Sequence, residues 1–166
     1  IEKENIHPLL PFAGDVIHEG RWGNSIRLGS TAKPPNSSPL NSWSSEGENG
    51  DPILIIRNGQ PADASPQGWV HITENINTDI SSIYLSSTQK LPILNANENY
   101  FSYNEAPEVP NQYTGAQVII NSDRLIFNAK TDHILLSGEK SINLSSNSSL
   151  NFDTNNFIID AKEIKL

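Results

Sequence analysis

Apolar residues recur every eight positions along the last third of the chain. Starting at position 118, seven consecutive positions spaced by eight hold Val, Ile or Leu. If about a quarter of residues were of these types, such a run would arise by chance in roughly one of ten thousand trials. Two residues further on, four of six positions are also apolar. The two sets are Val118, Ile126, Ile134, Ile142, Leu150, Ile158 and Leu166, and then Ile120, Leu136, Leu144 and Phe152.

This octad repeat predicts strands rather than a helix. An apolar pair at alternate positions, followed by polar residues such as those from Ser145 to Ser149, indicates a short strand with one inward face and then a turn. In a helix, eight residues miss a whole number of turns by about 80°, so the apolar stripe would wind around the helix. We therefore expect short strands that lie across an axis and stack along it.

The number of octads favours three chains over one. A single-chain β-helix with three octads per coil would form only about two coils from residues 118–166, and a solenoid needs about three repeats. Three chains wound together each supply one face per level, and six levels at about 4.8 Å would span roughly 30 Å. The sequence thus predicts a homotrimer. Its expected core residues are Val118, Ile120, Ile126, Ile134, Leu136, Ile142, Leu144, Leu150, Phe152 and Ile158.

The first 80 residues predict short strands joined by turns. Residues 15–22 and 25–28 predict a hairpin around Gly23-Asn24, because Gly and Asn adopt the positive φ that tight turns need. Residues 30–51 are rich in Pro, Asn, Ser and Gly and predict a long surface loop.

Two apolar runs complete this front region. Ile53 to Ile56, followed by Asn58-Gly59, predicts a strand that is buried on both faces. Trp69 to Ile72 predicts another strand. Four or five strands in about 80 residues favour a small closed β-barrel.

A fainter copy of the repeat precedes the stem. Ile83 and Leu85 are followed eight residues later by Leu91 and Ile93, but the step from position 83 to 118 is 35, which is not a multiple of eight. The repeat therefore begins early and is interrupted, or residues 83–93 form a barrel strand or hairpin. The predicted division is a barrel over 1–80, first β-helix strands over 81–94, a loop excursion over 95–116 and the stem over 117–166.

Composition and charge agree with an all-β protein. The chain has 20 Asn, 20 Ser, 11 Pro and 10 Gly, and no Pro follows position 110. The formal net charge is −8, of which −1 falls on residues 118–166, and this argues against nucleic acid or an anionic membrane as the main partner. The absence of Cys excludes a disulfide framework and thiolate metal sites. No apolar run approaches the length of a membrane span, and the lack of Met, with Ile first, suggests a fragment or a processed chain.

Catalytic chemistry is not indicated. The four His residues show no local metal-ligand spacing, and we expect His133 to cap the stem or face solvent. Asp15 and Glu19 share a predicted strand, where carboxylates are usually solvated. No nucleophile elbow, phosphate-binding loop or dinucleotide motif occurs. We expect no enzyme activity, no cofactor and no metal. The His residues are His7, His18, His71 and His133.

Four segments resemble one protein family, the central spike proteins of contractile phage tail baseplates. The segments are Gly14 to Ser30, Glu48 to Ile53, Ser82 to Leu85 and the stem from Val118. In that family an oligonucleotide/oligosaccharide-binding (OB) barrel precedes an octad-repeat triple-stranded β-helix. The resemblance covers about two thirds of the chain, and the stem alone is also similar to those of trimeric tail fibres.

The resemblance implies a structural role in the virion. It implies a homotrimer below the tail tube that docks on a trimeric hub protein and is driven through the host outer membrane when the tail contracts. A separate tip protein is a further expected partner, and the lysozyme domain of some members has no room here. One alternative is a tail-fibre or receptor-binding stem module. Another is a carbohydrate-active enzyme on a single-chain β-helix, which needs more coils and clustered acids.

Overall fold

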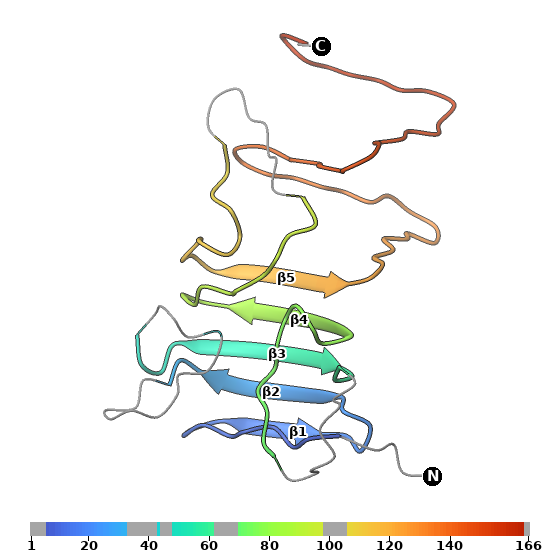
Figure 1. The fold of residues 1–166 in the computed structure, drawn as a ribbon. Helices are drawn as coiled ribbons and strands as arrows, with labels where there is room; N and C mark the ends of the chain where they lie inside the picture. Colours follow the sequence, from blue (N-terminus) through green and yellow to red (C-terminus); the bar gives the residue numbers. More distant parts are fainter. Residues whose placement is uncertain (1–5, 33–42, 44–47, 62–69, 98–105, 165–166) are drawn as a thin grey trace.

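The protein is all-β, as the sequence predicts. The computed structural model describes residues 6–32, 43, 48–61, 70–97 and 106–164, and these residues contain no helix. Five strands form one antiparallel sheet in chain order, with β1 and β5 at its edges (Figure 1). The strands are β1 (Val16–Glu19), β2 (Ser25–Ser30), β3 (Pro52–Asn58), β4 (Ser81–Ser86) and β5 (Gln117–Ser122).

The predicted hairpin is confirmed by the pairing of β1 with β2, in which Ile17 lies opposite Arg27. The turn closes through backbone hydrogen bonds from the Gly20 N–H to the Asn24 carbonyl and from the Gly23 N–H to the Gly20 carbonyl, at 2.8 and 3.2 Å. Gly23 has a φ of +86°, which residues with a side chain rarely adopt. The turn chemistry read from the sequence therefore places this hairpin correctly.

Strand β3 is buried on one face only, so the prediction of burial on both faces is wrong. Ile53 and Ile55 are buried, whereas Leu54 is half-buried and Ile56 is exposed. A continuous apolar run is typical of a strand that is covered on both sides. Here segments of the same chain cover one face of the sheet, and in the described part of the chain nothing covers the other.

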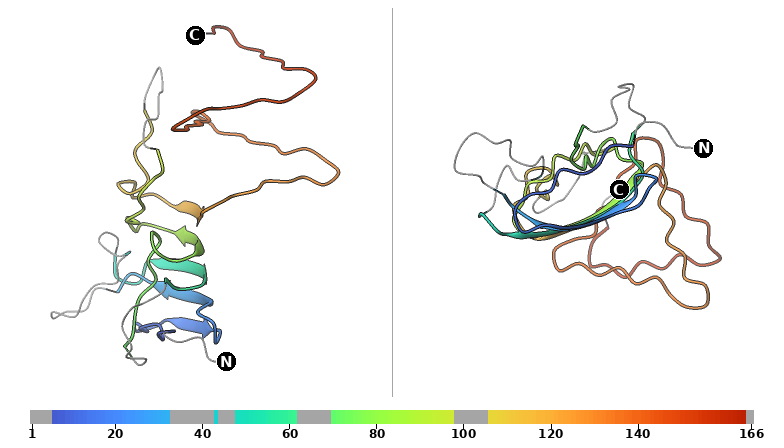
Figure 2. Two further views of the ribbon diagram at one scale, coloured as in Figure 1. Left: turned by 45° about the vertical axis from the view of Figure 1, so that its right-hand side comes forward. Right: turned by 90° about the horizontal axis from the view of Figure 1, so that it is seen from below.

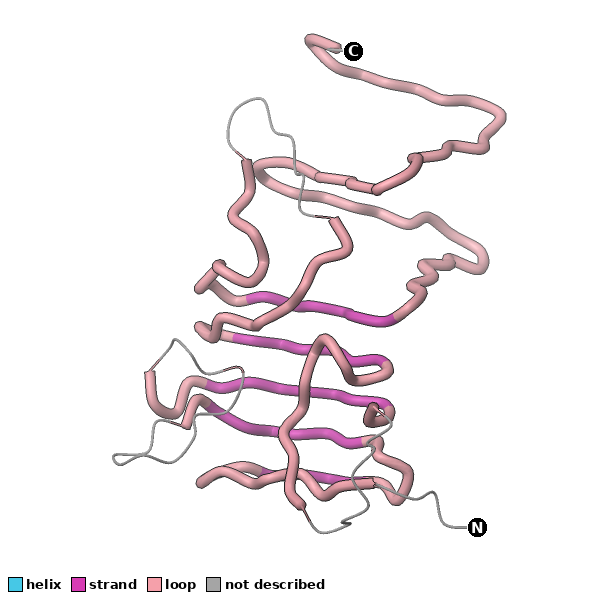
Figure 3. The backbone as a smooth tube through the Cα atoms, in the orientation of Figure 1, coloured by secondary structure: helices cyan, strands magenta, loops and turns pink. Residues whose placement is uncertain are grey.

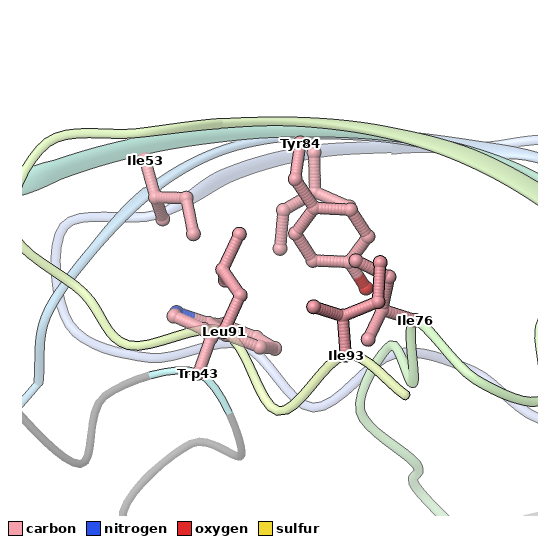
Figure 4. Close-up of a cluster of buried hydrophobic side chains, with 7 residues drawn as sticks. Trp43, Ile53, Ile76, Tyr84, Leu91 and Ile93 are labelled. Carbon is pink, nitrogen blue, oxygen red and sulfur yellow. The ribbon is translucent and has the colours of Figure 1, made fainter. Parts of the chain in front are cut away.

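The covered face carries the core. Side chains of β3 and β4 pack there against residues from the segments that cross the sheet, as Figure 4 shows for six labelled residues. The cluster consists of Trp43, Ile53, Ile55, Ile76, Tyr84, Leu91 and Ile93. In the view from below (Figure 2, right), the covering segments lie on one side of the sheet and the stem extends on the other.

Trp43 corrects the prediction that residues 30–51 form a surface loop. Its side chain is 1% exposed and meets the ring of Phe12 edge-to-face at 6.1 Å between ring centroids. Ser, Asn and Pro surround this residue in the sequence, so local composition hides its role. The neighbouring residues 33–42 and 44–47 lie outside the described residues.

The closed barrel is not confirmed, because β1 and β5 are not paired with each other. A single parallel bridge, between Leu9 and Ile72, joins two segments outside the sheet, with hydrogen bonds from the Leu10 N–H to the Ile72 carbonyl and from the Ile72 N–H to the Pro8 carbonyl. The strand predicted at 69–72 is thus reduced to this bridge over its described residues 70–72, and Trp69 lies outside them.

Strand β4 joins the front of the chain to the start of the stem. Ile83 lies opposite Ile56 of β3 on one side and opposite Ile120 of β5 on the other. The strand that begins the octad repeat therefore belongs to the same sheet as β1 to β3. The predicted boundary between residues 80 and 81 stays a prediction.

Candidate interaction surface

The stem starts on β5, where two of the predicted core residues lie on the open face of the sheet. Val118 is 68% exposed and Ile120 is 44% exposed. Ile119, between them, packs against the core on the opposite face. The alternation of a strand thus presents the first apolar pair of the repeat away from the folded core.

Beyond β5 the backbone follows the same eight-residue period as the sequence. It runs extended between bends, and the bends include five positions that are eight residues apart. Each lies five residues after an apolar octad position, so the period of the backbone and that of the apolar residues coincide. In Figure 3 this part of the chain is the long irregular course above β5. The five positions are Asp123, Thr131, Glu139, Asn147 and Asn155.

The remaining predicted core residues are not brought together within one chain. From position 122 to 164 every residue except Asn143 is exposed, and residues 123–164 form no strand pairing in the described part of the chain. The eight apolar side chains concerned are between 52% and 86% exposed; they are Ile126, Ile134, Leu136, Ile142, Leu144, Leu150, Phe152 and Ile158. Exposed apolar side chains in this number mark the segment as a candidate contact surface.

The stem touches the rest of its own chain near residue 96. The Asn147 side-chain amide donates to the Ala96 carbonyl at 2.8 Å. Asn, Ser and Leu side chains of residues 143–150 and residues 95–97 line a hollow of about 580 Å³ between the two segments. The start of the predicted excursion at 95–116 thus lies beside the stem. Residues 98–105 of the excursion lie outside the described residues.

The covered face of the sheet also buries two arginines, Arg27 and Arg57, that form ion pairs with acidic side chains. The Arg27 guanidinium is fully buried; its Nε donates to Glu74, its Nη1 pairs with Asp15, and its Nη2 donates to the Leu10 carbonyl at 3.1 Å. It also lies 5.2 Å from the centroid of the Trp43 ring. Through these contacts the guanidinium donors of Arg27 join β2 to the covering segments.

The ion pair of the second buried arginine, Arg57 with Asp79, has a longer distance. Arg57 Nη1 and Asp79 Oδ1 are 3.6 Å apart, which is too long for a hydrogen bond. Burial raises the pKa of Asp79 to about 6, although the Arg57 charge and the hydrogen bond from the Asn75 N–H oppose this rise. Burial also raises the pKa of the Tyr84 hydroxyl.

The His residues are dispersed over the fold. His7 is buried, with Nδ1 3.0 Å from the Val70 carbonyl oxygen, whereas His18 and His71 are exposed. His133 is exposed beside Asp132. Within the described ranges no three His, Asp or Glu side chains gather as metal ligands, and no helix is long and apolar enough to cross a membrane.

The chain was also compared with known proteins. No protein family, no curated protein and no solved structure matches it. The interpretation of the surface therefore depends on its own residues and geometry.

The structure adds residues that the sequence did not single out. Glu74 and Asp79 are buried acids in the segment between β3 and β4, and Arg27 and Arg57 are buried bases in β2 and β3. No local signal placed the two arginines: in β2 Arg27 alternates with Ile26 and Leu28, which predicts Arg27 on the solvent face. In the fold, Arg27 and Arg57 instead share the buried face of Ile55. A charged residue at an inward position indicates a buried partner elsewhere in the chain.

Proposed function

We propose that this chain is one of three identical subunits of a structural rod, the central spike of a contractile phage tail baseplate. One observation supports it most: from Asp123 to Asn155 bends recur every eight residues, in step with apolar side chains that are exposed in the single chain. Three such chains would bury these side chains on a common axis and would pair the extended segments of one chain with those of the next. The expected structure is the triple-stranded β-helix.

The front region is proposed to be the OB-like barrel of such a spike. The covering segments and the bridge between Leu9 and Ile72 support this proposal, since they partly enclose the face that holds the core. In this arrangement the barrel would face a trimeric hub protein and the stem would point toward the host outer membrane.

A rod of this kind suits mechanical work. Strands stacked along an axis, from chains that interlock, separate only if all three chains come apart together, so the body resists axial load. Winding the chains around each other also leaves no long free sheet edge. The proposal includes no enzyme activity, and a separate protein would form the tip.

Mass in solution tests the proposal. A trimer should show three times the 18.3 kDa of the chain by light scattering or native mass spectrometry. A protein that remains monomeric at micromolar concentration would contradict both the spike and the alternative, a trimeric tail-fibre or receptor-binding stem. Binding of host glycans by the trimer would favour that alternative, and the spike proposal expects none.

A further inference from the structure

The open face of the sheet carries two straight rows of aligned side chains, one position from each strand. In the first row all five residues are apolar, and in the second row four are apolar and the fifth is His18. Polar residues bound the rows, among them Asn58, Ser81 and Ser122. The first row is Val16, Leu28, Leu54, Leu85 and Val118, and the second row is His18, Ile26, Ile56, Ile83 and Ile120.

This face does not have the character of a sheet surface in contact with water. In an antiparallel sheet with one solvated face, polar residues normally occupy the outward positions of each strand. Neither row contains a Lys, Arg, Asp or Glu. Leu28 is 51% exposed and Ile26 is 43% exposed. Two shallow hollows lie along the rows, one of about 330 Å³ beside Leu28, Leu54 and Leu85 and one of about 420 Å³ beside Ile26 and Ile56.

The rows lead directly into the stem. Val118 ends the first row and Ile120 ends the second, and these two residues are also the first apolar pair of the octad repeat. The apolar surface through which the stems would associate is therefore continuous with the two rows on the sheet. The stems would also hold the sheets of the same copies close together, at a high effective concentration.

We propose that the open face of the sheet, as well as the stem, is a contact surface for a second copy of this chain. The inference rests on the proposed trimer and extends it, because the front region then contributes to assembly through β1 to β4. The chain has a net charge of −8, so copies repel one another at long range and contact has to come from an uncharged surface. The two rows are such a surface.

Thiol reactivity tests this inference, because the chain has no native Cys. Leu28→Cys places a thiol in the first row, three strands away from the stem, and Thr78→Cys places a control thiol at an exposed position in a covering segment. In the trimer of this chain we expect the thiol at position 28 to react with a maleimide at least about tenfold more slowly than the one at position 78. Adding Ile142→Asp, which we expect to give monomers, should make the two rates similar.

The outcomes separate the inference from the proposed function. Equal rates at positions 28 and 78 in a verified trimer overturn the inference and leave the trimer intact. A slow thiol at position 28 that persists in the monomer also overturns it, because the covering group then belongs to the same chain. Protection that depends on a co-purifying protein or lipid, seen by native mass spectrometry, overturns it too. A wild-type monomer contradicts the inference and the proposed function together. If Leu28→Cys blocks folding, Ile26→Cys supplies the same measurement.

Discussion

Arg27 on β2 donates from Nε to both carboxylate oxygens of Glu74, at 2.8 and 3.1 Å, although the two residues are 47 positions apart. Both side chains are fully buried. We expect Arg27→Ala to lower the free energy of unfolding by about 3–5 kcal/mol, because it leaves the carboxylates of Glu74 and Asp15 buried without their cation. Urea unfolding at fixed protein concentration measures the loss. The control is Arg21→Ala, at an exposed position, which should cost less than about 1 kcal/mol; similar losses for both variants would contradict the role assigned to Arg27.

Asp79 should make stability depend on pH. Its pKa is raised from 3.8 to about 6 in the folded protein, so its contribution to stability is full below pH 3.8 and is lost as the pH rises through about 6. The difference is at most about 3 kcal/mol. Asp79→Asn should therefore match the wild type near pH 4 and become more stable than it toward pH 7. The measurement is urea unfolding of both proteins across this range; a variant that is less stable at pH 7 would show that the ionised pair with Arg57 is favourable.

Ile142→Asp should prevent assembly of the stem. Three carboxylates would meet on one axis, and burying unpaired charges costs more than the lost apolar contact. Light scattering should find monomers. Ser148→Asp adds the same charge in the polar half of the repeat and should still form trimers. Trimers of Ile142→Asp with the heat resistance of the wild type would refute the stem proposal.

A side chain at Gly59 should destabilise the fold. Its φ is +86°, and an added Cβ would lie 2.5 Å from Cδ1 of Ile80. Gly50 has a similar φ of +94° but open space around it. We expect Gly50→Ala to cost about 1 kcal/mol from backbone strain alone, and Gly59→Ala to cost about 2–3 kcal/mol from strain and crowding together. Thermal unfolding of the two variants compares them, and an equal loss would mean that Ile80 moves aside freely.

Short sequence patterns predicted the elements that depend on neighbouring residues. The hairpin of β1 and β2 depends on Gly23, and the apolar runs that form β3 and β4 are visible in the sequence. Trp43 could not be placed in this way, because its partners are Phe12 and residues of distant strands. The burial of one face of β3 rather than both depends on where the covering segments run, which no short pattern contains.

The candidate interaction surface also has one part that was predictable from the sequence and one part that was not. The octad positions from Val118 onward follow from spacing alone, and the backbone bends at the same period. The two rows on the open face are different, because they exist only when five strands align in one register. Leu28 and Leu85 are 57 positions apart and share a row only through Leu54. Ion pairs such as Arg27 with Glu74 are also products of the fold.

The pairing of β5 with β4 would fix the register in which three stems associate. A repeat of eight residues is the same after a shift by eight, so three identical stems could join one step out of line and still match apolar to apolar. Six residue pairs tie β5 to β4, from Ser81 with Ser122 to Ser86 with Gln117, and their sequence does not recur along the stem. If the stems associate from this fixed strand onward, every copy starts in the same register. The three chains would then be aligned without a shift along the whole rod.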